Sequence, residues 1–132
     1  MTMSFEMATL LPAAPERVYN AWLSADEHSA FTGSPATVDP TVGGAFTAWD
    51  GYISGTTLEM TPTSRIVQAW RSTDFPESAP DSRLEIRFEA APEGTRLTLI
   101  HSGFPEGSGD EYRQGWIDYY FAPMAEYFTA DE

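Results

Sequence analysis

The sequence of 132 residues contains no cysteine and no lysine. Without cysteine, the chain has no disulfide, no thiolate nucleophile and no cysteine-based metal site. Without lysine, it has no Schiff-base catalyst. It also has no run of about 20 apolar residues that would cross a bilayer, and no leading segment that resembles a signal peptide. We therefore expect a cytoplasmic protein.

Positive charge is scarce along the whole chain. Seven arginines stand against 20 acidic residues, and the formal net charge is −13. Such a balance repels phosphate backbones and anionic lipid headgroups, so we expect neither nucleic-acid binding nor stable membrane association. Hydrophobic residues make up 42% of the chain and aromatic residues 14%, which indicates a folded globule. The length favours a single domain over residues 1–132.

An aromatic segment closes the chain between Ser108 and Phe128. Ser108, with Glu111 three residues later, is a capping-box signature that predicts a helix beginning near Gly109. Pro123 predicts a bend in this helix. At 100° per residue, its aromatic stripe consists of Tyr112, Trp116, Tyr119, Tyr120, Pro123 and Tyr127. The stripe is interpreted either as a core seam or as the roof of a ligand cavity.

The N-terminal third predicts one strand and two short helices. Residues 3–11 alternate with period two, which indicates a half-buried strand. Pro15 suits the first turn of a helix. Ser24 and Glu27 form a second capping box, and the helix that they start should end at Gly33.

From Gly43 onwards, closely spaced strand patterns separated by turn signals predict a β-meander. Strands are expected at 43–49, 52–60, 65–72, 83–89 and from Thr95. Asp50 and Gly51 form a hairpin turn, and a ligand role for Asp50 is the lesser alternative. The segment 73–81 is interpreted as a solvated connection or, alternatively, as a rim over an entrance. The order of elements predicts an α+β fold, with helices on one face of an antiparallel sheet.

Alternation within these strands predicts which side chains face the helix. Leu84, Ile86 and Phe88 point one way, and the intervening charged side chains form a solvated ladder with which Arg71 should pair. His101 follows the apolar side of its strand. Two further inward positions on one strand are Gln68 and Trp70, whereas the facing of Trp49 stays open because the turn follows it directly. His28, beside two acids, is expected at the surface.

Several stretches together resemble a known family. They are Gly43-Gly44 with Phe46, AWDGYISGTTLEMTP, RIVQAWR, TRLTLIHSGFP and GWIDYYFAPMAEYF. Over Phe5 to Phe128, the chain resembles homologues of the heat-shock protein 90 ATPase activator, within the START-like (SRPBCC) superfamily. The resemblance implies a helix-grip fold, in which a curved seven-stranded antiparallel sheet holds the C-terminal helix, with two short helices after the first strand. It also implies a cavity of the kind that takes lipids, polyketides or hormones.

The same resemblance limits the functions that the chain is expected to have. The eukaryotic activators carry a further N-terminal domain that contacts the chaperone, and residues 1–132 hold no counterpart of it, which favours ligand binding over a co-chaperone role. Some superfamily members use a pocket lysine, which this sequence lacks. Others bind iron through paired histidines, but His28 and His101 lie in dissimilar elements, so no metal and no cofactor are expected.

We interpret the protein as a binder of a small hydrophobic or aromatic ligand between sheet and helix. The candidate ligand-binding residues are Trp70, Gln68, Phe88, His101, Trp116 and Tyr120. One alternative is a cyclase- or hydrolase-like enzyme that uses His101 as acid and base. The other is an interaction protein of the chaperone-activator type, which would act through an outer surface.

Overall fold

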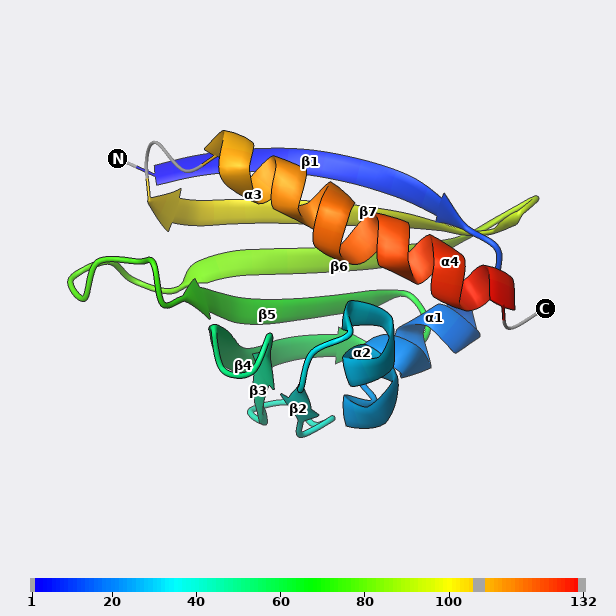
Figure 1. Ribbon diagram of the computed structural model, residues 1–132, viewed down its shortest axis with the longest axis horizontal. Coiled ribbons are helices and arrows are strands. Elements are labelled where there is room, and N and C mark those ends of the chain that lie inside the picture. The colour runs from blue at the N-terminus through cyan, green and yellow to red at the C-terminus, as the bar shows by residue number, and fades with distance from the viewer. Residues whose placement is uncertain (1, 106–108, 131–132) are drawn as a thin grey trace.

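Figure 1 shows the computed structural model, which describes residues 2–105 and 109–130. One antiparallel sheet of seven strands carries a long helix across one face, and two short helices lie beside the C-terminal end of that helix (Figure 1). The α+β helix-grip expectation is therefore confirmed. In the described part of the chain, every helix is too short or too polar to cross a bilayer.

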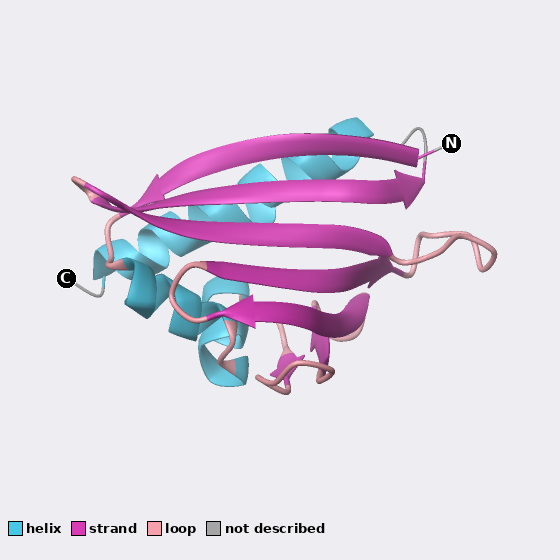
Figure 2. Ribbon diagram, turned by 180° about the vertical axis from the view of Figure 1, so that it is seen from behind, coloured by secondary structure: helices cyan, strands magenta, loops and turns pink. Residues whose placement is uncertain are grey.

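The sheet is a meander closed at one edge by the first strand. Its order is β1-β7-β6-β5-β4-β3-β2, and every neighbouring pair is antiparallel. Seen from behind, the strands cover the helices (Figure 2). The strands are β1 (Thr2–Leu11), β2 (Thr37–Val38), β3 (Ala45–Ala48), β4 (Ile53–Thr61), β5 (Arg65–Ser72), β6 (Ser82–Ala91) and β7 (Gly94–Pro105). Only the short β2 was not among the strands expected from the sequence.

The two short helices are α1 (Pro15–Trp22) and α2 (Ala25–Thr32). The Ser24 hydroxyl accepts a hydrogen bond from the Glu27 backbone N–H at 3.3 Å, as the capping box predicts. Gly33 ends α2 with φ 76°, a left-handed conformation that favours glycine. Both predicted ends of this helix are confirmed.

The closing helix consists of three consecutive parts. They are α3 (Gly109–Trp116), the π-helical turn η1 (Ile117–Phe121) and α4 (Ala122–Ala130). In the turn, the Ala122 N–H bonds to the Ile117 carbonyl, five residues back instead of four. Pro123 follows directly, and its ring crowds the carbonyl of Tyr119, which gives a physical reason for the wider turn at this place. The predicted cap at Ser108 lies outside the described residues.

The wider turn changes which side chains face the sheet. An extra residue in this turn rotates the side chains after Ile117 away from the 100° pattern, so beyond Trp116 the stripe forms a buried core seam only at Tyr120. Tyr119 is 58% exposed, and Tyr127 is half-buried. The buried side chains after Tyr120 are Phe121, Met124 and Phe128.

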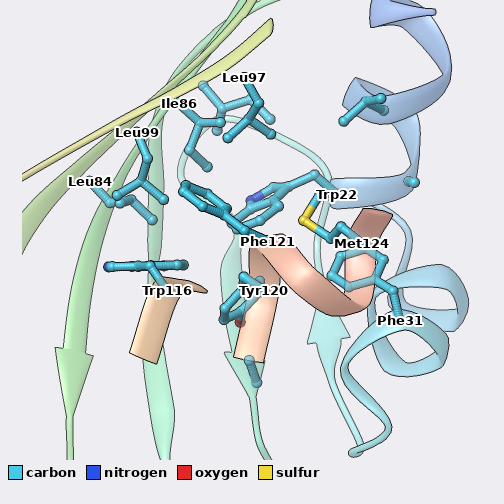
Figure 3. Packing of buried hydrophobic residues seen from close by; sticks show 14 of the residues in the cluster. Trp22, Phe31, Leu84, Ile86, Leu97, Leu99, Trp116, Tyr120, Phe121 and Met124 are labelled. Atoms are coloured by element: carbon cyan, nitrogen blue, oxygen red, sulfur yellow. The ribbon is translucent and has the colours of Figure 1, made fainter. Parts of the chain in front are cut away.

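These apolar side chains pack against the sheet and the short helices. Figure 3 shows Leu84 and Ile86 of β6 and Leu97 and Leu99 of β7 facing the closing helix. Trp22 of α1 and Phe31 of α2 complete the cluster around Met124 (Figure 3). The alternation predicted for β6 and β7 is confirmed, because the inward side chains are fully or nearly fully buried.

The opposite face of the sheet corrects one expectation about charge. Glu85 is only 4% exposed, because Arg65, Arg83 and Arg87 all pair with its carboxylate. The hydrogen bond from Arg65, followed by those from the other two arginines, lowers the pKa of Glu85 to about 2, against the effect of burial. In the predicted row of charged side chains, the arginines are therefore in contact with solvent, whereas Glu85 is buried. Arg71 does not join it, and its guanidinium bonds to the loop 73–81 instead.

Candidate functional site

A pocket of about 470 Å³ lies between the N-terminal part of the closing helix and one end of the sheet. Its walls come from the β3–β4 hairpin, from β5 and the loop after it, and from α3 and η1. This volume falls in the range of small-ligand sites. The lining residues are Trp49, Tyr52, Ile53, Trp70, Asp74, Glu111, Tyr112, Gly115, Trp116, Tyr119 and Tyr120.

Trp49 enters the pocket because of an unusual backbone conformation. Its φ is 55° and that of Asp50 is 56°, both in the left-handed region that costs a residue with a side chain about 1 to 2 kcal/mol. The Asp50 N–H is tied to the Pro35 carbonyl at 2.9 Å, which helps to hold this turn. The Trp49 ring meets Tyr119 edge to face at 5.5 Å between ring centroids. The sequence did not decide which way Trp49 faces, and in the structure its side chain lines the pocket.

A chain of three hydrogen bonds runs behind the pocket from the Trp116 indole to the Trp70 backbone. The Trp116 Nε1–H donates to His101 Nδ1 at 3.2 Å. Because His101 accepts at Nδ1, its own proton is on Nε2, which donates to Ser82 Oγ at 2.8 Å. The Ser82 hydroxyl in turn donates to the Trp70 carbonyl at 2.7 Å. Burial lowers the pKa of His101 to about 3, so the imidazole is neutral at pH 7.

A second buried histidine holds Tyr120. His28 Nδ1 donates to the Trp22 carbonyl at 3.1 Å, and His28 Nε2 accepts from the Tyr120 hydroxyl at 3.1 Å. Burial lowers the pKa of His28 to about 4, although the hydrogen bond to the Trp22 carbonyl opposes this effect. The expected surface position of His28 is therefore wrong. Its neighbours Asp26 and Glu27 suggested an exposed turn, but His28 lies on the opposite side of α2, against the closing helix.

The mouth of the pocket is phenolic and acidic. The Tyr52 hydroxyl donates to the Asp74 carboxylate, and this bond raises the pKa of Tyr52. Burial raises the pKa of Tyr112, so both hydroxyls are neutral at pH 7. Asp74 is exposed in the loop after β5, and Glu111 is exposed in the first turn of α3. Among the residues that the structure describes, no arginine, lysine or histidine lines the pocket.

The six candidate residues from the sequence fall into two groups. Trp70, Trp116 and Tyr120 line the pocket. The other three are buried behind it and already have partners. Gln68 accepts from the Trp22 indole at 3.4 Å and donates to Thr57 at 3.3 Å, Phe88 packs edge to face on Tyr19 at 5.5 Å, and His101 bonds to Ser82 and Trp116.

Several lining residues were not singled out from the sequence. Asp74 lies in the segment 73–81, for which a rim over an entrance was the alternative interpretation, and the structure places this part of the loop at the pocket mouth. Glu111 was interpreted only as a helix-capping residue. Tyr52 follows the hairpin turn, where alternation gives no reliable facing. Asp50 is exposed and does not line the pocket.

The described lining of the pocket combines apolar surface with a few polar groups. Within residues 2–105 and 109–130, no group of three or more histidine, aspartate or glutamate side chains is placed to hold a metal ion. The pocket offers broad apolar walls and a few hydroxyl and carboxylate groups at its mouth. Such a site can enclose a ligand and orient its polar atoms.

Comparison with known proteins places this fold in a family. Residues 12–129 match the family described as Activator of Hsp90 ATPase homolog 1-like protein. The chain belongs to this family. A human protein named activator of 90 kDa heat shock protein ATPase homolog 1 is 31% identical over 115 residues, which are 87% of this chain and 34% of that protein. The chain spans about a third of the length of the curated relatives that it matches.

Two solved structures that resemble this family member are also similar to it in length. An HSP90 activator from Plasmodium falciparum is 29% identical, with a TM-score of 0.83 over 91% of both chains. A protein from Chromobacterium violaceum is 26% identical, with a TM-score of 0.77 over 95% of this chain and 96% of that one. These relatives share the sheet and the closing helix that form the pocket.

Proposed function

We propose that this protein binds a small hydrophobic or aromatic ligand in the pocket between the sheet and the closing helix. The observation that carries the proposal is the preorganisation of the pocket walls. The side chains of Trp116 and Tyr120 are held from behind by hydrogen bonds to buried histidines, and the Trp70 backbone carbonyl accepts a hydrogen bond from buried Ser82. Walls that are already ordered lose little conformational freedom when a ligand enters. We place this activity in the cytoplasm.

Burial of apolar surface is the driving force in this proposal. A ligand that buries about 200 Å² of apolar area gains about 5 kcal/mol, at about 25 cal/mol per Å², before the entropy of association is subtracted. The hydroxyls of Tyr52 and Tyr112 orient its polar atoms at the mouth. Gln68 and His101, which the sequence suggested for this role, are engaged with Trp22 and Trp116.

The experiment is a titration of lipids and aromatic metabolites followed by tryptophan fluorescence. Tyr119→Ala removes an exposed part of the pocket wall. Ile117→Ala, in the same π-helical turn but outside the lining, is the matched control. We expect saturable binding that Tyr119→Ala weakens about tenfold and Ile117→Ala leaves within about twofold, in line with the area lost. No saturable response from any compound, or equal effects of the two substitutions, contradicts the proposal.

The geometry does not favour the enzyme alternative. His101 is fully buried, both of its ring nitrogens have hydrogen-bond partners, and burial lowers its pKa to about 3. A general acid or base has to reach the substrate and to titrate near the working pH. His101 does neither in this arrangement, and it supports Trp116 instead.

A second candidate function is activation of a chaperone ATPase. It is favoured by the Plasmodium falciparum structure, which is described as an HSP90 activator and has nearly the same length as this chain. The test is the ATPase rate of the cognate Hsp90 with increasing amounts of this protein. A saturable rise in rate supports the candidate, and an unchanged rate excludes it. If Tyr119→Ala leaves the rise intact, activation uses a surface other than the pocket.

A further inference from the structure

The pocket walls are unusually rich in aromatic rings. Seven of the eleven lining residues are tryptophan or tyrosine, and they come from the β3–β4 hairpin, β5, α3 and η1. Trp49 projects from the β3–β4 hairpin, Trp70 from β5, and Tyr112 and Trp116 from α3. Trp70 packs against Tyr112 and Trp116, at 5.6 Å and 5.8 Å between ring centroids, so these three rings form one continuous aromatic wall of the pocket. Ring faces carry a negative potential that attracts cations.

The charges at the pocket all have one sign. Among the described residues, Asp74 and Glu111 are the only acidic or basic side chains in its lining. Arg71, on the strand that supplies Trp70, donates to the carbonyls of Ala79 at 2.6 Å and Pro76 at 2.8 Å, so its guanidinium is directed into the loop. His101 behind the wall is neutral at pH 7, because burial lowers its pKa to about 3.

These two features favour the same class of ligand. Aromatic walls alone accept any apolar group, and carboxylates alone attract any cation from water. Together, rings around a cavity and carboxylates at its mouth form the arrangement that recognises quaternary ammonium groups and amines on an apolar body. A ligand with a carboxylate or phosphate head would meet two acidic side chains and no compensating cation in the described part of the lining.

We propose that the pocket selects a cationic amphiphile or aromatic cation, such as a quaternary ammonium or amine that carries an apolar chain or ring, over neutral and anionic ligands of the same size. This inference rests on the proposed function, that the pocket is a ligand site. It adds the sign of the ligand's charge. The apolar body contacts Trp70 and Trp116, and the cationic head lies toward Trp49, Asp74 and Glu111.

The test uses three probes that share a ten-carbon chain and differ in the head. They are decyltrimethylammonium, decanol and decanoate, each titrated below its micelle concentration by calorimetry at low salt. We expect decyltrimethylammonium to bind at least about tenfold more tightly than decanoate, with decanol between them. In the variant Asp74→Asn with Glu111→Gln, the cation's advantage should fall to within about threefold.

The control separates the pocket from the overall charge of the protein. Glu89→Gln with Glu93→Gln removes the same two charges from exposed sites near the β6–β7 turn, outside the pocket lining. We expect this variant to keep the full preference for the cation. All four substitutions are at exposed positions, so circular dichroism should show unchanged folds.

Each outcome decides between the two proposals. If decanoate or decanol binds as tightly as the cation, the pocket is a ligand site without charge selection, and this inference is overturned while the proposed function stands. If the control variant loses as much preference as the Asp74 and Glu111 variant, net charge and not the pocket is responsible, and the inference is again overturned. If no probe binds, the proposed function fails, and this inference fails with it.

Discussion

The two halves of the closing helix make different contacts with the same sheet. In the N-terminal half, Tyr112, Trp116 and Tyr119 border a pocket of about 470 Å³. In the C-terminal half, Met124 and Phe128 are fully buried in a cluster with aliphatic side chains of β6 and β7. One half is hollow and rich in aromatic residues, and the other is solid.

The π-helical turn lies where the hollow half meets the solid half. The π-helical turn Ile117–Phe121 holds one residue more than an α-helical turn. Two consecutive residues, Tyr120 and Phe121, are both buried there. Tyr120 faces the pocket, and Phe121 begins the solid cluster. A regular helix would carry the stripe of Tyr112 and Trp116 onward to Pro123. The turn instead ends the aromatic wall and starts the apolar seam.

The largest expected effect is on stability at the solid end. Phe128→Ala removes a fully buried ring that Arg17 covers at 5.4 Å from its centroid. We expect a loss of about 3 to 5 kcal/mol in the free energy of unfolding, because the cavity left behind has no solvent access. Urea denaturation followed by circular dichroism measures it. A loss below about 1 kcal/mol would mean that this end is not tightly packed.

The next effect is a loss of stability in mild acid. The folded-state pKa values of His28 and His101 are lowered to about 4 and about 3, below the ordinary value of 6.5. The unfolded chain therefore binds more protons between pH 6.5 and those values, and stability falls as the pH falls through that window. Between pH 6.5 and pH 5 we expect a loss of about 2 to 3 kcal/mol.

Denaturant unfolding at several pH values from 7 to 5 checks this dependence. The pKa of Glu85 is lowered to about 2, so its protonation reduces stability only below pH 4.5. A change in stability above pH 5 is therefore due to the two histidines. Stability that is flat from pH 6.5 to pH 5 would contradict the neutral, buried state of both imidazoles.

A smaller effect is expected from the support behind the pocket wall. Trp116→Phe keeps an aromatic ring but removes the N–H that bonds to His101 Nδ1. A buried acceptor without its donor costs about 1 to 3 kcal/mol, and we expect a loss in that range. Trp70→Phe, the same substitution on the neighbouring wall ring, removes no indole hydrogen bond within the described residues and is the control, which should cost less. Equal losses from the two substitutions would show that the bond to His101 does not hold the wall.

The smallest expected effect on stability is at the hollow end itself. Tyr119→Ala removes a ring that is 58% exposed, and we expect a change within about 0.5 kcal/mol. The same substitution should weaken ligand binding, so stability and affinity separate at this residue. A stability loss comparable to that of Phe128→Ala would mean that Tyr119 is part of the core.

Strands were easier to predict from the sequence than the closing helix. On β6 and β7 the period-two pattern determines facing directly, so Leu84, Phe88 and His101 were correctly placed on the inner side. On the helix, each residue's facing depends on all the turns before it, and a single π-helical turn displaced the rest of the stripe. Pro123 signalled an irregularity but not its kind.

The sequence predicted part of the lining of the candidate pocket and missed the rest for a physical reason. Alternation shows which side chains face inward, but not whether a cavity or a neighbour lies beyond them. Gln68 and His101 face inward and are fully engaged by partners from distant segments, Trp22 and Trp116. Trp49 depends on a left-handed backbone that no pattern of residue types specifies. Contacts between distant segments decide these positions, and sequence spacing does not contain them.

The most direct test uses the four tryptophans as reporters. Trp49, Trp70 and Trp116 line the pocket, whereas the Trp22 indole lies in the solid cluster and donates to Gln68. The measurement is the shift of each indole N–H signal in a ¹⁵N correlation spectrum during titration with decyltrimethylammonium. Our account predicts saturable shifts that are largest at the three pocket indoles and smallest at Trp22. Shifts that are uniform, absent, or largest at Trp22 would contradict it.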